Sequence, residues 1–227
     1  DYLKKTHDIP QGKITYLPAF ADEKYLAEDF TPENDTVDFV FLGNLGIAQN
    51  LIGVLSAVKQ IKDLPDFKVH FVGDGSMLDE MKRFVKENEM DDVVRFYGRR
   101  PVEEMPTFYK LADVCLVSLN AENQTGLTLP SKVQGYMAAG KPIIGMIDGS
   151  AQDVIRESEC GICVGSNDID GLAEAMKAFI LNGNDYNACG QNGRDYFVKH
   201  FRKDIFMRTL ENKIKEMEHD SNVTFCE

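Results

Sequence analysis

The stretch VDFVFLGNLGIAQNLIGVLSAVKQI, residues 37–61, decides the fold. Residues 37–42 form an apolar run that ends at Gly43, as expected of a strand that is buried on both faces of a parallel sheet. Apolar residues then recur at 51, 52, 54, 55, 58 and 61, which is the stripe of a helix that packs on such a sheet. The stretch therefore predicts a β-strand, a glycine-bearing turn and an α-helix.

The same alternation continues along the chain. Further apolar strands are predicted at 69–72, 93–97, 114–117, 142–146 and 161–164, and a short strand is expected earlier, at 14–17. Helical patterns lie at 76–89, 103–111, 131–140, 152–158, 168–181, 185–201 and 203–218. Because the strands from residue 37 onward alternate with helices and no hairpin signal interrupts them, we predict an α/β fold with a doubly wound, Rossmann-like parallel sheet of about six strands.

Composition restricts the class of function. The 227 residues carry a net charge of −12 with a pI near 4.8, which argues against nucleic-acid binding and against broad adhesion to anionic membranes. No apolar run is long enough to predict a transmembrane segment. Cysteines at 115, 160, 163, 189 and 226 are scattered, so we expect structural thiols in a reducing cytosol rather than a disulfide framework, a redox pair or a zinc site.

Open α/β sheets bind their ligands beyond the carboxyl ends of the strands, so the residues after each strand are the candidates for a site. Gly43-Asn44-Leu45-Gly46 follows the first strand, where backbone N–H groups and a helix dipole suit a phosphate. The G-x-G-x-x-G fingerprint and a Walker lysine are both absent there, which disfavours a dinucleotide dehydrogenase. A tight turn without a ligand remains the alternative for this loop.

The segment Thr128-Leu129-Pro130-Ser131-Lys132 gives a sharper signal. Pro130 stiffens the entry to a helix, Ser131 is expected to cap that helix, and Lys132 lies in its first turn. A cation at this position opposes the helix dipole unless an anion is bound nearby, and a diphosphate would satisfy both the lysine and the helix start. The alternative is that Lys132 extends into water.

Other polar residues have plainer explanations. Arg99 and Arg100, after the third strand, are compatible with a base, a phosphate or solvent. Asp74 lies between two glycines, where a turn-forming Asp is common. Asp168 and Asp170 match the D-x-D pattern of metal-dependent sugar transferases, but they open a helix, so we assign them to capping and predict no metal site.

The order of these motifs resembles the C-terminal domain of glycosyltransferase family 4, which has the two-domain GT-B architecture. The matching pieces are FVFLGNLG (39–46), HFVGDGSMLDEM (70–81), VVRFYGRRPVEEMPTFYKLADVCLVSL (93–119), LPSKVQGYMAAGKPIIGMIDG (129–149) and CGICVGSNDIDGLAEAM (160–176). With the late helices they cover about residues 37–217, in the order and spacing of the family.

The resemblance implies a binding site for a nucleotide-diphosphate sugar, the donor substrate of a transferase that needs no cofactor. Its residues would be Gly43, Asn44, Gly73, Asp74, Arg99, Val102, Ser131 and Lys132, with Gln134 standing in for a ribose-binding glutamate. The helix start at Ser131 would lie beneath the diphosphate, and the stretch from Arg99 to Val102 would flank the base. Such enzymes are usually retaining and metal-independent. The resemblance assigns no catalytic residue here.

The resemblance also implies a domain organisation. Residues 1–36 would be an interdomain linker, residues 37–200 the donor-binding domain, and residues 201–227 a helix that packs back on an N-terminal domain missing from this chain. The chain alone is then expected to be inactive. Its partners would be the nucleotide sugar, the missing domain and a glycan or lipid-linked acceptor of polysaccharide biosynthesis. The expected location is cytoplasmic, with the missing domain reaching the inner membrane face.

Two departures from the family pattern bear on activity. The arginine and lysine that usually follow the first strand are absent from residues 43–49. The family's paired glutamates would fall at Leu127 and Gly135, and neither residue is acidic. Two alternatives therefore stay open, namely a non-catalytic nucleotide-binding or interaction module and a GT-B sugar-nucleotide epimerase.

Overall fold

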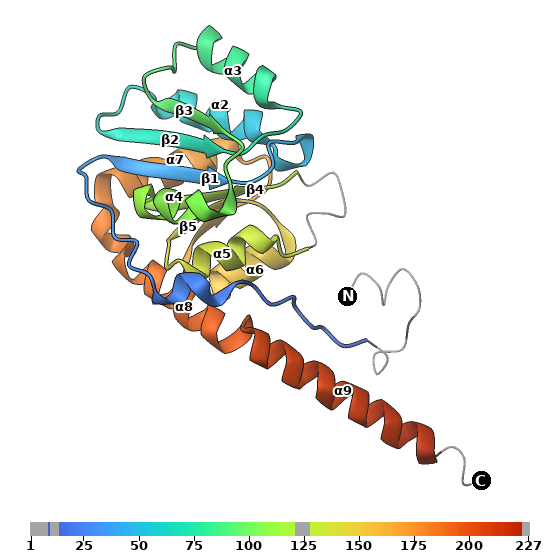
Figure 1. Cartoon of the computed structure of the whole chain (residues 1–227). Coiled ribbons are helices and arrows are strands. Elements are labelled where there is room, and N and C mark those ends of the chain that lie inside the picture. The colour runs from blue at the N-terminus through green and yellow to red at the C-terminus, as the bar shows by residue number, and fades with distance from the viewer. Residues whose placement is uncertain (1–8, 10–13, 121–127, 224–227) are drawn as a thin grey trace.

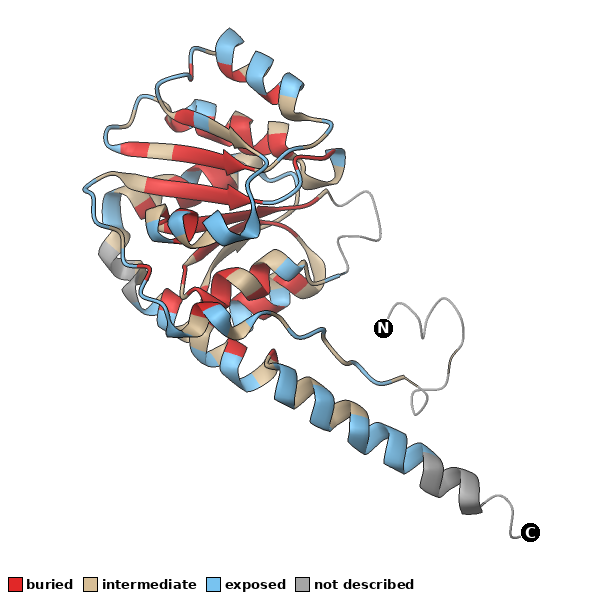
Figure 2. Cartoon of the chain, in the orientation of Figure 1, coloured by how far each residue is buried: buried red, intermediate tan, exposed pale blue. Residues whose placement is uncertain are grey.

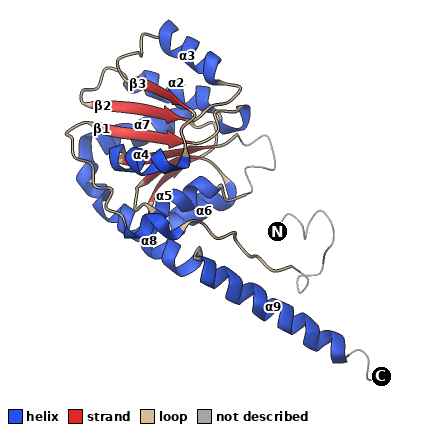
Figure 3. Cartoon of the chain, in the orientation of Figure 1, coloured by secondary structure: helices blue, strands red, loops and turns tan. Residues whose placement is uncertain are grey.

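The computed structural model describes residue 9, residues 14–120 and residues 128–223. The strands in this part of the chain are β1 (Val37–Leu42), β2 (Phe67–Val72), β3 (Val94–Gly98), β4 (Val114–Ser118), β5 (Ile143–Met146) and β6 (Gly161–Val164). The helices are α2 (Leu51–Ile61), α3 (Leu78–Glu87), α4 (Met105–Leu111), α5 (Ser131–Ala138), α6 (Gly149–Glu157), α7 (Ile169–Asn182), α8 (Asn187–His200) and α9 (Lys203–Val223) (Figure 3). Short 3₁₀ turns are η2 (Glu23–Ala27), η3 (Ile47–Gln49), η4 (Val102–Glu104) and η6 (Gly183–Tyr186).

All six strands lie in one parallel sheet, in the order β3-β2-β1-β4-β5-β6 (Figure 1). The chain first moves outward from β1 to β3, then returns to the other side of β1 and continues outward from β4 to β6. This is the doubly wound, Rossmann-like sheet that the sequence predicts, and the order reverses between β1 and β4.

Helices cover both faces of the sheet, which explains why the strands are apolar without alternation (Figure 2). Helices α2, α3 and α7 enclose one core, built around the rings of Phe39, Phe41 and Phe71. Helices α4, α5, α6 and α8 enclose the other, around Tyr109 and Tyr136. The two layers hold the ends of the strands in fixed positions, where a site can be built.

The segment before β1 packs against the second core. Tyr25, in η2, and Phe30 are buried beside Tyr109, with ring centroids 4.8 and 5.5 Å from it. The Lys141 ammonium donates hydrogen bonds to the Phe30 and Ala112 carbonyls and so ties this segment to the body. Helix α9, in contrast, extends away from the sheet (Figure 1). The assignment of residues 1–36 and 201–227 to contacts with another domain stays a prediction.

Three local predictions are wrong. Residues 14–17 do not form a strand. Ser76 does not cap α3, which begins at Leu78 after Met77. Ser131 does not cap α5 but is its first residue, because Pro130 already has the extended backbone that an N-cap needs. Asp168 does cap α7, since its carboxylate accepts a hydrogen bond from the Gly171 N–H at 2.9 Å.

Candidate nucleotide-binding site

The carboxyl edge of the sheet brings most of the predicted residues together. A cavity of 660 Å³ opens there, and its lining includes Gly43, Asn44, Gly73, Asp74 and Arg99. An adjoining cavity of 680 Å³ shares Arg99 and adds Val102. Met105, at the start of α4, lines both cavities. The sequence did not indicate it, because an apolar residue in a helical pattern is not by itself a sign of a binding site.

The loops after β1 and β2 cross at the floor of this cavity. Gly43 and Gly73 have φ angles of +132° and +147°, and a Cβ on Gly73 would lie 1.8 Å from the Gly43 carbonyl oxygen. The Leu45 N–H donates to the Asp74 carbonyl at 2.9 Å, which joins the loops further. The Asp74 carboxylate accepts from the Gly75 N–H at 2.8 Å, the turn-forming role that the sequence indicates. The floor is therefore rigid and needs glycine at both positions.

The turn after β1 is less suited to an anion than the sequence indicates. Helix α2 begins only at Leu51, and η3 intervenes. The Gly46 N–H already donates to the Gln49 side chain at 3.1 Å. Asn120, beyond β4, holds η3 in place by donating to the Ile47 and Ala48 carbonyls. The loop is thus well ordered, but part of its hydrogen-bonding capacity is used internally.

Lys132 supplies the positive charge that this turn lacks. From the first turn of α5 its ammonium reaches the loop after β1, so that Nζ lies 3.3 Å from where a Cβ on Gly43 would be. Nζ is buried, has no hydrogen-bond partner, and lies 3.7 Å from the centroid of the Phe41 ring. Burial lowers the pKa of Lys132 to about 7. The alternative in which this lysine extends into water is therefore wrong.

A buried ammonium without a partner is costly, and one aromatic face compensates it only in part. An anion between Lys132 and the start of α5 would supply the missing acceptor and would also suit the helix dipole. Gly43 leaves the room for such an anion, because a side chain there would contact Nζ. This arrangement has the charge and the space that a phosphate would need.

The remaining predicted residues are placed differently. Ser131 is exposed at the start of α5. Gln134 is buried, and its amide donates to the Ala19 carbonyl at 2.6 Å. This hydrogen bond holds the segment before β1 and disfavours a role of Gln134 in binding ribose. A Cβ on Gly135 would lie 3.0 Å from the Tyr109 hydroxyl, so this position has little room for a larger side chain. Leu127 lies outside the described residues.

Other reactive groups in the described part of the chain serve the fold. His70 is buried, with Nε2 2.7 Å from an Asp38 oxygen and Nδ1 2.9 Å from the Tyr97 hydroxyl, a network that joins β1, β2 and β3. Cys160 and Cys163 are free thiols, and burial raises the pKa of each, to about 11 and about 12. Neither is therefore a reactive thiolate.

Within the described residues, no three His, Cys, Asp or Glu side chains gather as metal ligands would. Asp170, the second residue of the D-x-D pattern, accepts a hydrogen bond from Gln60 at 2.7 Å. The same residues include no helix with the length and apolarity needed to cross a bilayer.

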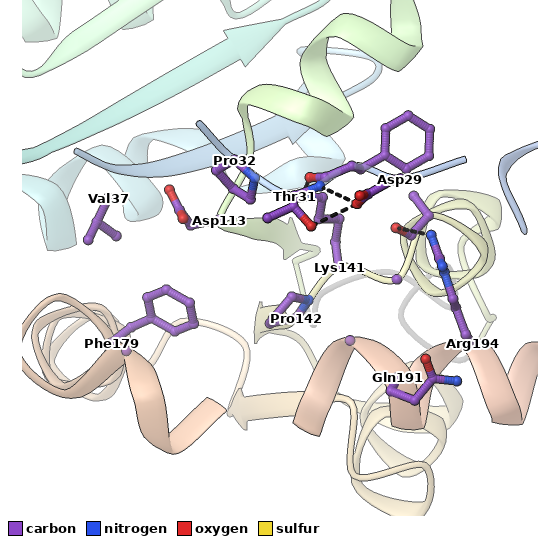
Figure 4. Close-up of a pocket in the computed structure, with 15 residues that line it drawn as sticks. Asp29, Thr31, Pro32, Val37, Asp113, Lys141, Pro142, Phe179, Gln191 and Arg194 are labelled. Carbon is purple, nitrogen blue, oxygen red and sulfur yellow. Dashed lines mark hydrogen bonds between the residues drawn. The ribbon is translucent and has the colours of Figure 1, made fainter. Parts of the chain in front are cut away.

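A further cavity, of 590 Å³, lies near the amino ends of β1, β4 and β5, away from the predicted site (Figure 4). Its cations are Lys141 and Arg194. The Arg194 guanidinium donates to the Glu28 and Ala139 carbonyls, and Lys141 also bonds to carbonyls of the chain. These hydrogen bonds hold the segment before β1, and they leave the Arg194 Nε buried without a hydrogen-bond partner.

Comparison with known proteins identifies the family. The family profile described as glycosyl transferases group 1 matches residues 23–196, more than half of the chain. The chain belongs to this family. A probable glycosyltransferase of Pseudomonas aeruginosa, WbjE, is 34% identical over 61% of this chain and 34% of its own length.

Solved structures agree on the fold. Sucrose-phosphate synthase from Thermosynechococcus elongatus superposes with a TM-score of 0.78 at 19% identity, over 96% of this chain and 56% of that one. HepE from Anabaena, in complex with UDP, gives a TM-score of 0.71 at 14% identity, over 80% of this chain and 49% of that one. These likenesses show the doubly wound, Rossmann-like α/β fold. The chain spans about one third to just over half of the lengths of the first three curated relatives that it matches.

Proposed function

We propose that this chain is the donor-binding, C-terminal half of a GT-B glycosyltransferase of family 4. It would bind a nucleoside diphosphate sugar for transfer to a glycan or a lipid-linked acceptor. The observation that carries the proposal is the buried, unpartnered ammonium of Lys132, which lies against the glycine loop after β1. Membership of the group 1 family supports the chemistry, and the cavity beside Arg99 and Val102 offers space for the base.

The proposed mechanism is electrostatic. As the glycosidic bond to the donor breaks, the departing nucleoside diphosphate gains negative charge. Lys132 and the start of α5, with Arg99 and Arg100 at the cavity wall, would stabilise that charge more in the transition state than in the ground state. The reaction is proposed to be retaining and metal-independent, with the diphosphate stabilised by these groups.

The proposal also includes the rest of the enzyme. The acceptor site and any acid or base would come mainly from an N-terminal domain, since the relatives are longer than this chain and the described residues form only one sheet. That domain would carry the contact with a membrane-bound acceptor on the cytoplasmic side. The chain alone is then expected to bind the donor without transferring the sugar.

Calorimetric titration with UDP and with GDP, without added metal, tests the proposal. UDP is included because the structure of HepE contains it. We expect one nucleotide to bind and Lys132→Met to weaken it about tenfold or more, since a charged hydrogen bond contributes roughly 1.5–3 kcal/mol. Lys132→Met should also stabilise the unliganded chain, because it removes a buried charge without a partner. Lys86→Met, at an exposed position on α3, is the control.

A chain that binds neither nucleotide nor its sugar conjugates would contradict the donor-site proposal. The non-catalytic interaction module would then be favoured, in agreement with the absence of glutamate at Gly135 and of cations at residues 43–49. If the nucleotide binds but Lys132→Met leaves its affinity unchanged, the phosphate does not lie where we place it.

A further inference from the structure

A second buried polar group lies without a partner at the same edge of the sheet. Ser118 is the last residue of β4, is 1% exposed, and its hydroxyl makes no hydrogen bond. Buried hydroxyls are almost always paired, so an unpaired one requires an explanation. The neighbouring polar groups are already used, since the Leu119 N–H donates to Met146 and Asn120 bonds to η3.

The sheet places Ser118 at the same edge as the proposed phosphate site. Side chains alternate along β4, so Ser118 faces the same side as Val114 and Leu116, which pack in the core that contains Phe41. The parallel register pairs Phe39 with Val114 and Val40 with Cys115, and the same register continued by three residues would bring Ser118 level with Gly43. Gly43 is also the residue against which the Lys132 ammonium lies.

Two hydrogen-bond donors without acceptors therefore lie at the carboxyl edge of β1 and β4, with Ser118 at the end of β4 and Lys132 against Gly43. They do so where the strand order reverses, the position at which open α/β sheets bind their ligands. A hydroxyl and an ammonium both donate, so the missing partner is an acceptor, and the net positive charge requires an anionic one. The cavity beside Arg99 and Met105 lies on the other side of Gly43, above β2 and β3.

We propose that Ser118 donates, together with Lys132, to the distal phosphate of the bound nucleoside diphosphate. This inference rests on the proposed function and assigns a further binding residue within that site. The base end of the nucleotide occupies the cavity above β2 and β3, so the part beside β4 is the phosphate farthest from the base. Ser118 thereby selects for the diphosphate over the monophosphate.

Binding of UDP and UMP, or of GDP and GMP, to Ser118→Ala tests this inference. We expect the variant to lose about five- to tenfold in affinity for the diphosphate and to keep the affinity of the wild type for the monophosphate. Its melting temperature should equal or exceed that of the wild type without nucleotide, because the hydroxyl has no partner to lose. Ser158→Ala is the matched control, since that buried hydroxyl donates to the Ile155 carbonyl at 3.2 Å. It should lower the melting temperature and leave the affinity ratio unchanged.

The outcomes separate the two proposals. If the wild type prefers the diphosphate and Ser118→Ala keeps that preference, the inference about Ser118 is wrong while the donor site stands. A lower melting temperature of Ser118→Ala with an unchanged ratio would likewise make Ser118 a structural residue only. If the wild type binds no nucleotide, both proposals fail.

Discussion

Lys132 affects both the stability of the free protein and the proposed binding of a phosphate. Its ammonium lies over the Phe41 ring and has no hydrogen-bond acceptor, so the free protein bears the cost of a desolvated charge. A bound phosphate would remove that cost. Residues that bind a ligand often destabilise the free protein, because their polar groups have no partner when the ligand is absent.

The pKa of Lys132 leads to a pH dependence of binding. In the free chain burial lowers this pKa to about 7, so near pH 8 most molecules carry a neutral amine. A bound phosphate favours the ammonium and raises the pKa, so binding takes up a proton. We therefore expect the affinity for the nucleoside diphosphate to fall as the pH rises from about 7 to about 9, by up to tenfold per pH unit.

Calorimetry at pH 8 in buffers of different ionisation enthalpy measures this uptake directly. The wild type should take up between about half a proton and one proton per nucleotide bound. Lys132→Met should take up none. Equal proton uptake by both proteins would assign the titration to another group.

At the scale of elements, the crossing of the loops after β1 and β2 determines the floor of the site. Gly73 has a φ of +147° and contacts the backbone of Gly43, whereas Gly98, the last residue of β3, has a φ of +67° and nothing within 4 Å of its Cβ position. Both glycines relieve backbone strain, but only Gly73 also permits two loops to touch. Substitutions at Gly73 and Gly98 therefore separate the cost of a strained backbone conformation from the cost of a steric clash.

Gly73→Ala is expected to lower the free energy of unfolding by about 2 kcal/mol or more and to abolish nucleotide binding, because the added methyl group pushes the Gly43 loop away. Gly98→Ala should lower it by about 1 kcal/mol, the cost of a left-handed backbone alone, and should retain binding. Urea denaturation and calorimetric titration of both variants give the comparison. Equal losses would show that the contact with Gly43 does not matter.

At the scale of the whole molecule, the folded unit begins before the first strand. The family profile starts at residue 23, and the structure agrees, since η2 and Phe30 close the core around Tyr109. Lys141, Arg194 and Gln134 each donate to backbone carbonyls of this segment. The segment is therefore held by the body through both apolar and polar contacts.

Tyr25→Ala is expected to cost about 3–4 kcal/mol in the free energy of unfolding, as for other large aromatic side chains removed from a core. Tyr25 is 7% exposed, whereas Tyr16, in the same segment, is 71% exposed. Tyr16→Ala should therefore change stability by no more than about 0.5 kcal/mol. Urea denaturation distinguishes the two, and a small effect of Tyr25→Ala would mean that η2 is not part of the folding unit.

Much of the fold was predictable because its signals are local. A strand in a parallel sheet is buried on both faces and reads as an apolar run, so Val37–Leu42 and Leu51–Ile61 were predicted to the residue. The turns after the strands were predictable for the same reason. The caps at Ser76 and Ser131 were predicted wrongly, because one capping residue competes with its neighbours for the helix start, and the backbone of Met77 and Pro130 decides the result.

The sequence by itself determined the parallel α/β fold and the turns that follow its strands, since apolar patterning and glycine turns act within a few residues. Only the tertiary structure decided what the side chains in those loops do. It buried the Lys132 ammonium against Gly43, directed Gln134 to Ala19, and left Ser118 without a partner. These outcomes depend on contacts between residues far apart in the chain, 115 positions in the case of Gln134 and Ala19. The order of strands in the sheet brings such residues together, and no local pattern encodes that order.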